Sequence, residues 1–489
     1  MEIKFGTSGW RGIISDEFTF ENVEIVTQAI CDYIRDSQRS AVSSPATKAS
    51  AGRPRSQVIV GYDTRFFSEK FAEITAAVIA ANGLQALLTN RDTPTPTIAF
   101  ELLRRKAAGG INFTASHNPA QYNGIKFSPA WGGPALPETT RTIEENCQKY
   151  LAQPNLVKKM PFAEALKKRQ VMMIDPRPQY LKRLRKIVDL PAIRKARLKI
   201  GVDALYGTGR EYLDELLKEA GVKMHLLHNW RDVLFGGRPP EPSYENIPEL
   251  VHIVKKEKCH LGLGIDGDAD RFGIIDEKGN YIQPGHVIAL LLDHLQKTRK
   301  WHGVVARSVM TTNFIDAIAH KHGVTVRETP VGFKYIGDIL VKEGLIIGGE
   351  ESGGLTIHGH VPEKDGILAC LLVAEMVAYQ KKPLSLILAG LYKEVGVFLF
   401  ERVNFRVTTE RMAELKQTLK ENPPERIAGV KVREVVTIDG FKFILEGGSW
   451  VGLRLSGTEP VVRYYVEAQR QDTVRKLLQA GKQLITGKK

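Results

Sequence analysis

Three aspartates in the stretch GIDGDADRFG have a spacing that points directly to chemistry. Asp266, Asp268 and Asp270 alternate with small residues, so an extended or looped backbone can aim all three carboxylates at one point. Hard oxygen ligands at this density suit Mg²⁺. We therefore predict a magnesium site formed by these three side chains.

Two other structures are compatible with the same letters. An Asp-Gly turn in a hairpin would place the carboxylates in a loop that needs no ion. A calcium loop starting at Asp266 would have Glu277 at its twelfth position, as that motif requires. Its sixth position holds Arg271 where the calcium motif needs glycine, and this favours magnesium.

A serine in INFTASHNP, residues 111–119, stands beside a histidine in a polar turn that a proline ends. Taken alone, Ser116 is more typical of a turn residue or a helix cap than of a catalyst. The metal loop changes this expectation, because three carboxylates around one Mg²⁺ leave room for an anionic oxygen from another group. A phosphorylated Ser116 would supply that oxygen, and Arg271 could orient or neutralise it. His117 could support this chemistry or only hydrogen-bond the loop.

The segment RLSGTEP combines cationic, hydroxyl and backbone-amide donors of the kind that bind phosphate. The donors are Arg454, Ser456, Gly457, Thr458 and, shortly after the segment, Arg463. A hairpin turn that contains glycine would have the same letters. In combination with the metal loop, the segment predicts a second phosphate site that uses no metal.

The segment GGEESGG, residues 348–354, offers two carboxylates and a hydroxyl on a glycine-rich loop. Such groups could hold the vicinal hydroxyls of a sugar. By itself this pattern is weak evidence for a sugar site.

A repeated alternation of strands and helices positions these loops. An apolar run at 56–64 is followed by an amphipathic helix over 66–83 and a further strand at 84–90. Looser versions of the same order begin at Leu198 and near Gly303. In open α/β sheets, ligands gather at the carboxyl ends of strands, so the loops could converge on one cleft.

These patterns divide the chain into four units. We expect three similar α/β domains at 1–165, 166–278 and 279–395, and a smaller α+β domain at 396–489. The stretch at 37–57, rich in Ser, Ala, Pro and basic residues, is typical of a flexible insertion.

The net charge of +14 on 489 residues could reflect a nucleic-acid partner or a polyanionic small substrate. The basic residues are dispersed, and no helix-turn-helix, zinc-finger or aromatic-basic RNA motif accompanies them. A nucleic-acid partner is therefore not expected. Four scattered cysteines without CxxC spacing are typical of reduced packing residues.

No apolar run reaches the length needed to cross a bilayer. The best stretch, residues 366–379, is short and carries Glu375. The N-terminal letters MEIKFGTSGWRG contain no apolar core of signal-peptide length. We therefore expect a cytoplasmic location and no membrane partner.

Taken together, the loops resemble those of the α-D-phosphohexomutases. TASHNP resembles the phosphoserine loop of that family, DGDADR its metal loop, GEESGG its sugar-recognition loop and RLSGTEP its phosphate-binding loop, and FGTSGWRG resembles its opening motif. The motifs occur in the family's order and span residues 5–463. The resemblance implies a heart-shaped arrangement of three α/β domains and a smaller C-terminal domain.

The resemblance also implies a mechanism. Phosphorylated Ser116, held by Mg²⁺ on the three aspartates, would transfer its phosphoryl group to a free hydroxyl of a sugar 1-phosphate. The bisphosphate, glucose 1,6-bisphosphate for a glucose enzyme, would turn over and return its other phosphate to Ser116, leaving the 6-phosphate. Such transfer depends mainly on alignment and charge neutralisation.

Similarity to the family suggests roles for several side chains. Arg11 and Arg271 would lie near the transferring group. Lys126 in YNGIKF and Lys364 in EKDG are candidates for the general acid or base. Lys334 in VGFKYIG is a candidate on the substrate side.

The sugar is identified less directly. Glu350 and Ser352 match the loop that holds the sugar hydroxyls. Members that accept both mannose and glucose often carry GEMSGH and the glucosamine type GEQSGH, whereas Glu351 makes this chain resemble the glucose-type GEESFG, without its Phe. This favours a phosphoglucomutase and leaves open a phosphomannomutase or a broad mutase that includes pentose phosphates. For the oligomeric state, we expect a monomer or a homodimer.

Another enzyme class could use the same acidic ligands. A Mg²⁺-dependent phosphatase would attack with water and would not need RLSGTEP as a second phosphate site. Release of inorganic phosphate without formation of a sugar 6-phosphate would identify it.

Overall fold

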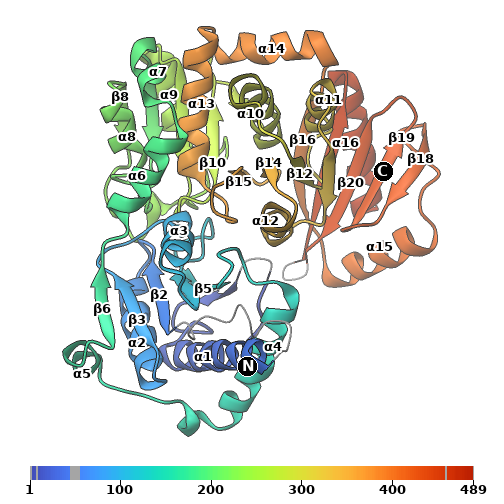
Figure 1. Ribbon diagram of the computed structural model, residues 1–489. Coiled ribbons are helices and arrows are strands. Elements are labelled where there is room, and N and C mark those ends of the chain that lie inside the picture. Colours follow the sequence, from blue (N-terminus) through green and yellow to red (C-terminus); the bar gives the residue numbers. More distant parts are fainter. Residues whose placement is uncertain (1–2, 7–8, 44–55, 457–459, 488–489) are drawn as a thin grey trace.

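The computed structural model describes residues 3–6, 9–43, 56–456 and 460–487, and these residues form four β-sheets. Figure 1 shows the first unit below the second and third units, with the fourth beside the third. Residues 37–43, which we predicted as part of the insertion, continue a helix, and most of the remaining insertion lies outside the described residues, as do Gly457 and Thr458.

The first sheet has the order β1-β5-β4-β2-β3-β6. Strands β4, β2, β3 and β6 run parallel, with β6 at one edge, and β5 and β1 are antiparallel additions at the other edge. The strands are β1 (Trp10–Ile13), β2 (Gln57–Tyr62), β3 (Gln85–Thr89), β4 (Gly109–Phe113), β5 (Tyr122–Pro129) and β6 (Val171–Ile174). The helices are α1 (Phe20–Ser43), α2 (Ser68–Ala81), α3 (Thr95–Arg105), α4 (Pro137–Ala152) and α5 (Phe162–Lys167), with a 3-10 turn η1 (Pro154–Leu156). Because β6 pairs with β3, this sheet extends beyond residue 165, where we expected the first unit to end.

The second sheet has the order β11-β10-β9-β7-β8. Strands β7, β8 and β9 are parallel, and β10 returns antiparallel to β9. The strands are β7 (Lys199–Asp203), β8 (Lys223–Leu227), β9 (Leu261–Ile265), β10 (Phe272–Ile275) and β11 (Tyr281–Ile282). The helices are α6 (Arg177–Ile187), α7 (Leu190–Ala196), α8 (Leu213–Glu219) and α9 (Pro248–Lys256), with a 3-10 turn η2 (Phe235–Gly237).

The third sheet, β13-β12-β14-β15, repeats this plan. Strands β13, β12 and β14 are parallel, and β15 returns antiparallel to β14. The strands are β12 (Val304–Ser308), β13 (Val326–Thr329), β14 (Leu345–Gly349) and β15 (Leu355–Ile357). The helices are α10 (Pro284–Arg299), α11 (Phe314–Lys321), α12 (Phe333–Lys342), α13 (Gly366–Gln380) and α14 (Leu384–Val395).

The fourth sheet is antiparallel and has the order β16-β21-β20-β19-β18-β17. Its strands are β16 (Leu399–Arg406), β17 (Arg426–Ile427), β18 (Val430–Val436), β19 (Phe441–Leu445), β20 (Trp450–Leu455) and β21 (Val461–Ala468), and its helices are α15 (Thr409–Glu421) and α16 (Gln471–Thr486). Three α/β units and a smaller α+β unit confirm the predicted fold class.

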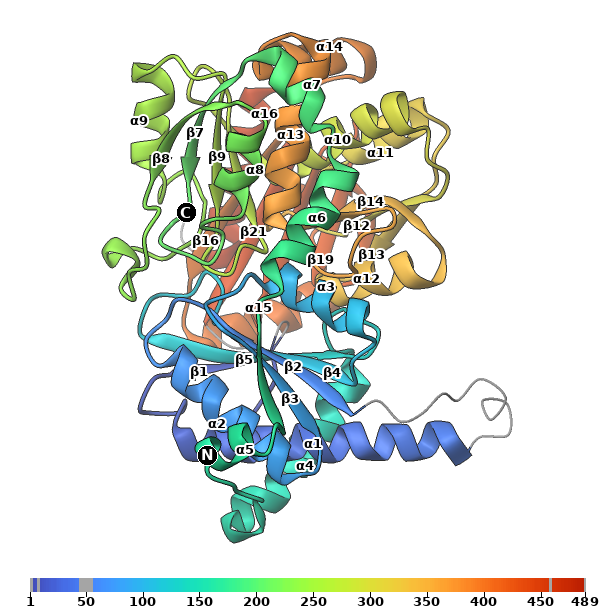
Figure 2. The ribbon, with the colours of Figure 1, turned by 60° about the vertical axis from the view of Figure 1, so that its left-hand side comes forward.

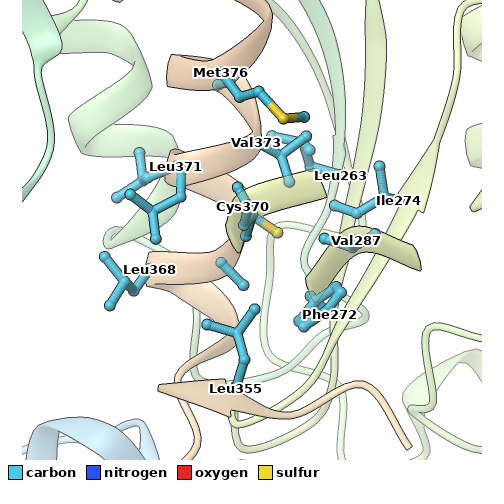
Figure 3. Packing of buried hydrophobic residues seen from close by; sticks show 14 of the residues in the cluster. Leu263, Phe272, Ile274, Val287, Leu355, Leu368, Cys370, Leu371, Val373 and Met376 are labelled. Atoms are coloured by element: carbon cyan, nitrogen blue, oxygen red, sulfur yellow. The ribbon is translucent and has the colours of Figure 1, made fainter. Parts of the chain in front are cut away.

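The second and third units share one hydrophobic core, whereas the first and the fourth have their own. Helix α13 is apolar on all sides and is buried over most of its length, as expected of a helix inside a core. Figure 3 shows Cys370, Val373 and Met376 of this helix on the side of Leu263 and Ile274 of the second unit, and Leu368 and Leu371 on its other side. The two units are therefore held together by burial of apolar surface.

Helix α13 is the apolar stretch whose Glu375 we noted in the sequence. Glu375 is fully buried and accepts hydrogen bonds from His294 Nε2 (2.8 Å) and Arg299 Nη2 (2.6 Å). Among the described residues, no helix is both long and apolar enough to cross a membrane.

Helix α3 connects the first unit to the second. Figure 2 shows α3 between the first sheet and α6. The ring of Phe100 on α3 lies 5.9 Å from that of Tyr180 on α6 in an edge-to-face contact. The first residue of α3, Thr95, donates its backbone N–H to the carbonyl oxygen of Asp268 (3.0 Å). This helix therefore places the first unit directly against the aspartate loop.

Candidate active site

The same local structure delivers a candidate loop in each α/β unit. Ser116 lies in the turn from β4 into β5, the three aspartates lie in the turn from β9 into β10, and Glu350 lies in the turn from β14 into β15. In each case a fully buried parallel strand ends and the chain returns antiparallel. The loops therefore stand at the carboxyl ends of parallel strands, where α/β sheets bind ligands. The aspartate loop joins an antiparallel pair, so the hairpin turn and the carboxylate cluster occur together.

The aspartate loop brings three buried carboxylates together, with one oxygen of each within 4.8 Å of the others. Ala269 adopts a positive φ of 58°, and its N–H bonds the carbonyl oxygen of Asp266 (2.9 Å), which makes the turn tight. Burial, followed by the negative charges of Asp268 and Asp270, raises the pKa of Asp266 well above its usual range. The loop is thus a site of concentrated negative charge with little water.

Two lysines neutralise part of this charge. Lys126 Nζ lies 2.6 Å from Asp268 Oδ2 and 2.8 Å from Asp270 Oδ2, and Lys364 Nζ lies 3.1 Å from Asp270 Oδ2. Burial alone would lower the pKa of Lys126, but the charges of Asp268 and Asp270 outweigh it and raise that pKa. The pKa of Lys364 is raised in the same way, mainly by Asp270 and Glu363. Both lysines are therefore proton donors in this arrangement.

Ser116 is buried and faces the aspartates. Its Oγ lies 2.8 Å from Asp266 Oδ2, to which the hydroxyl donates. Its φ of 52° is in the left-handed region, which is uncommon for a residue other than glycine. His117 Nδ1 lies 3.4 Å from the same Oγ. Burial, followed by the charges of Arg271 and Arg11, lowers the pKa of His117 well below its usual value, so its imidazole is neutral.

Arg11 and Arg271 place positive charge beside the serine. Arg11 Nη1 donates to Asn118 Oδ1 (2.6 Å), and the backbone N–H of Arg271 donates to Asp266 Oδ1 (2.8 Å). Burial and the proximity of Arg271 lower the pKa of Arg11 to about 10. Two arginines that repel each other in a buried site are suited to bind an anion between them.

The third unit contributes a carboxylate pair. Glu350 Oε1 accepts the N–H of Gly332 (2.7 Å), and burial together with the charge of Glu351 raises the pKa of Glu350 to about 7. Glu351 accepts from Ser308 Oγ (2.6 Å) and from the hydroxyl of Tyr465 in the fourth unit (3.4 Å).

The other predicted residues of the third unit lie close by in the chain. Ser352 is partly exposed in the same loop. Lys334 lies in the first turn of α12, two residues after the Gly332 that bonds Glu350, and burial lowers its pKa.

The fourth unit presents two arginines side by side. Arg454 on β20 is directly opposite Arg463 on β21, so both side chains project from one face of the sheet. Arg454 Nε donates to Asp439 Oδ2 (3.1 Å), and the N–H of buried Ser456 donates to Val461 (2.9 Å). Two cationic side chains on one face of the sheet are suited to contact one anion together, and Asp439 already balances part of their charge.

The comparisons with known proteins agree with this architecture. Models of the phosphoglucomutase/phosphomannomutase family match in chain order: the α/β/α domain I at residues 2–153, domain II at 178–279, domain III at 283–395 and the C-terminal domain at 403–481. A phosphoglucomutase/phosphomannomutase of Thermococcus kodakarensis is 31% identical over 481 residues, covering 98% of each chain. The chain belongs to the phosphoglucomutase/phosphomannomutase family.

A second relative and a solved structure extend the comparison. A phosphoglucomutase of Komagataeibacter xylinus is 29% identical, covering 98% of this chain and 89% of its own. A crystal structure from Thermus thermophilus, described as a candidate phosphomannomutase, is 31% identical with a TM-score of 0.82 and covers 99% of both chains. These names include both glucose and mannose, so they support a phosphohexomutase without selecting its sugar.

The phosphohexomutase loop that carries the aspartates fits a divalent cation. The Oδ1 atoms of Asp268 and Asp270 are buried and have no hydrogen-bond partner among the described residues. Buried carboxylate oxygens in this state are costly unless an ion or a donor binds them. All three ligands offer hard oxygen, which matches the preference of Mg²⁺.

Sequence reasoning missed two residues that support these loops. Thr95 Oγ1 donates to Asp268 Oδ2 (2.5 Å) and itself accepts from Asn112 (2.8 Å). Arg65 is fully buried and bonds backbone carbonyls of the serine loop. Polar letters shortly after two apolar strands, as in YDTR and TPTP, were the available signal, but nothing in the sequence indicates their partners.

Within this family fold, the structure brings most predicted site residues into one group. Ser116, His117, the aspartates, Arg11, Arg271, Lys126 and Lys364 are linked by the contacts above. Arg454 and Arg463 belong to the fourth unit, which reaches the loop of Glu350 through the contact of Tyr465 with Glu351. Gly457 and Thr458 lie outside the described part of the chain.

Proposed function

We propose that this protein interconverts glucose 1-phosphate and glucose 6-phosphate through a phosphorylated Ser116 and a bisphosphorylated sugar. The observation that carries the proposal is the 2.8 Å contact between Ser116 Oγ and Asp266, beside two further buried carboxylates. A buried serine at an ion-binding cluster, with two arginines beside it, suits a phosphate carrier better than a structural turn.

The cofactor that we propose is Mg²⁺, held by Asp266, Asp268, Asp270 and the phosphate on Ser116. When bound, the ion would neutralise charge on the phosphoryl oxygens during transfer. Arg11 and Arg271 would position the same group from the other side. Glucose 1,6-bisphosphate would be the intermediate and, when added, the activator that phosphorylates Ser116.

In the transfer step, the bond from Ser116 Oγ to phosphorus breaks and a bond from a sugar hydroxyl oxygen to phosphorus forms. The hydroxyl proton must pass to a base, and Ser116 Oγ regains a proton when its phosphate has left. Lys126 and Lys364 are the candidates, because both lie within hydrogen-bonding distance of the aspartates next to Ser116. A protonated lysine would give its proton to Ser116 Oγ as the phosphate leaves, and the resulting neutral amine would accept the proton of the sugar hydroxyl. His117, neutral and 3.4 Å from Oγ, is a third candidate.

The second phosphate of the sugar would bind in the fourth unit. Its proposed contacts are Arg454, Ser456, Gly457, Thr458 and Arg463. The opposed arginines on β20 and β21 support this assignment, because two cationic side chains on one face of the sheet can both donate to one phosphate.

The sugar itself would be held by the third unit. We assign Glu350 and Ser352 to its hydroxyls and Lys334 to the substrate side. Glucose is our first choice because Glu351 follows Glu350. Mannose phosphate, or a broader set that includes pentose phosphates, is the second candidate, because the names of similar proteins include mannose.

A coupled assay with the 1-phosphates of glucose, mannose, glucosamine and ribose, with trace glucose 1,6-bisphosphate, tests the proposal. We expect the highest kcat/KM for glucose 1-phosphate. Ser116→Ala should lose at least about a thousandfold in turnover, whereas Ser37→Ala on the exposed end of α1 should match the wild type. Near-wild-type turnover of Ser116→Ala would refute the carrier role, and inorganic phosphate release without glucose 6-phosphate would identify a phosphatase.

A further inference from the structure

Arg65 binds the serine loop through its backbone. The guanidinium donates to the carbonyl oxygens of Ser116 (2.6 Å), Asn118 (2.6 Å), Pro119 (2.8 Å) and Tyr122 (2.9 Å). Three of these carbonyls belong to the turn that connects β4 with β5, and Tyr122 is the first residue of β5. One side chain therefore fixes the path of the whole loop that presents Ser116.

The position of Arg65 is itself fixed. Its side chain is fully buried, and its Nε lies 3.1 Å from Asp63 Oδ2. Asp63 also accepts the backbone N–H of Arg65 (2.9 Å) and the hydroxyl of Ser68 (2.9 Å). A buried guanidinium is stable only when its donors are satisfied, so the side chain has little freedom to move away from the loop.

The loop needs such support, because Ser116 is held in an unfavourable conformation. Its φ of 52° brings the β-carbon close to the backbone. Two bonds hold the residue there, one from its N–H to Thr114 Oγ1 (2.8 Å) and one from Arg65 to its carbonyl oxygen (2.6 Å). Backbone strain of this kind persists only where the surroundings enforce it.

The second unit covers Arg65 with an aromatic ring. The guanidinium carbon lies 5.0 Å from the ring centroid of Phe235, which is 2% exposed. The loop that carries Phe235 is tied to the first unit, since Arg231 Nε donates to the carbonyl oxygen of Thr64 (3.2 Å). An aromatic ring over a buried cation adds attraction and excludes water.

The same loop also contacts the aspartate turn. The carbonyl oxygen of Pro240 accepts the N–H of Gly267, between two of the aspartates (3.1 Å). A β-carbon added at Gly267 would lie 3.0 Å from the carbonyl oxygen of Ser116, which Arg65 also binds. The serine turn and the aspartate turn thus approach closely, and Arg65 with Phe235 lies at this junction.

We infer that Arg65 is a positioning residue for phosphoryl transfer at Ser116, and that Phe235 holds it in place from the unit that carries the metal ligands. The inference rests on the proposed function, because it assumes that Ser116 carries the phosphate. Phosphoryl transfer depends on alignment, and a displacement of the order of 1 Å can cost about a hundredfold in rate. Arg65 keeps Oγ aligned with Asp266, without contacting the substrate.

Three variants test this role: Arg65→Lys, Phe235→Leu and the matched control Arg91→Lys. Arg91 also joins the first unit to the second, through Glu211 (2.6 Å), and does not bond the serine loop. Lysine retains the charge of Arg65 but cannot reach four carbonyls from one planar group. We expect kcat of Arg65→Lys to fall about a hundredfold with KM within about threefold, a fall of about fivefold for Phe235→Leu, and no change for Arg91→Lys.

Two further readouts separate positioning from general stability. Phosphate released to water per turnover should rise in Arg65→Lys, because a misaligned phosphoserine is transferred less often to the sugar. Amide hydrogen exchange over residues 114–122 should accelerate at least about tenfold in Arg65→Lys and stay unchanged in Arg91→Lys. If Arg65→Lys does not fold, the same measurements on Phe235→Leu decide.

Wild-type-like kcat per folded site in Arg65→Lys, or unchanged exchange over 114–122, would overturn the inference. A wild-type enzyme that interconverts no sugar phosphate would overturn the proposed function instead. In that case the hydrogen-exchange comparison still tests whether Arg65 holds the loop.

Discussion

Ser116 Oγ and Asp266 Oδ2 lie 2.8 Å apart although 150 residues of chain separate them. The contact joins the first unit to the second at the point where three buried carboxylates meet. Any change at Asp266 should therefore affect both the proposed binding of Mg²⁺ and the serine.

Asp266→Asn should reduce the stabilisation that Mg²⁺ gives the protein. An ion that binds only the folded state raises the free energy of unfolding by about 2.7 kcal/mol at a hundredfold excess over Kd. Each tenfold loss of affinity removes about 1.4 kcal/mol of this effect. Thermal unfolding with Mg²⁺ and with EDTA measures it, and the exposed Asp16→Asn serves as control. An unchanged Mg²⁺ effect in Asp266→Asn would contradict the assignment of the site.

Ionisation of Glu350 should make kcat/KM fall with decreasing pH, starting near neutrality. This decrease is the acid limb of the pH profile. Its pKa of about 7, raised by burial and by Glu351, means that the carboxylate is present above that pH and is lost below it. If the carboxylate accepts sugar hydroxyls, kcat/KM should fall about tenfold per pH unit below 7. In Glu350→Gln the value should be low and lack this limb, while the exposed Glu343→Gln should retain it. All three proteins are assayed with the same substrate, so titration of the substrate's phosphate affects each pH profile equally.

His286 should lower the free energy of unfolding in acid. Burial lowers its pKa from 6.5 to about 4, and Nε2 donates to the carbonyl oxygen of Phe398 (2.7 Å). Between these two values the unfolded chain binds the proton and the folded protein does not, so stability falls as pH falls from 6.5 towards 4. At about 1.36 kcal/mol per pKa unit, the loss is about 3 kcal/mol.

Unfolding midpoints at pH 7.5 and 5 measure the contribution of His286. His286→Asn should lose less stability between these pH values than the wild type does. His252→Asn, at an exposed position of α9, should behave like the wild type. If His286→Asn loses as much stability between pH 7.5 and pH 5 as the wild type does, groups other than His286 cause the loss.

Leu371 tests the core shared by the second and third units. Its side chain is fully buried on α13, within the core that residues of both units form, and Figure 3 labels it. Leu371→Ala should lower the free energy of unfolding by about 2–5 kcal/mol, because it leaves a cavity. Leu386→Ala, at a 54% exposed position, should change it by about 0.5 kcal/mol or less. Chemical denaturation measures both, and separate transitions of the two units in Leu371→Ala would indicate that the shared core couples them.

Much of the site could be read from the sequence because its loops carry their chemistry locally. Asp266, Asp268 and Asp270 alternate within five residues, and Ser116 follows an apolar strand directly. Local spacing was enough to predict the carboxylate cluster, and the strand-helix alternation was enough to predict three α/β units.

Other features could not be read in this way. Nothing in YDTR indicates that Arg65 would be buried beneath a loop 51 residues away. The polar letters of TPTP gave no indication that Thr95 would bond an aspartate 173 residues later. The strand at 171–174 reads as the start of the second unit, and only its pairing with β3 assigns it to the first sheet.

The sequence by itself predicted which residues could hold an ion and a phosphate, because side-chain type and short-range spacing set that chemistry, and resemblance to the family added the prediction for the sugar. The tertiary structure decided which of them meet. It joined Ser116 to Asp266, set two lysines against the aspartates and opposed Arg454 to Arg463 on neighbouring strands. These contacts form between segments far apart in the chain, where packing of the units and pairing of strands fix the distances.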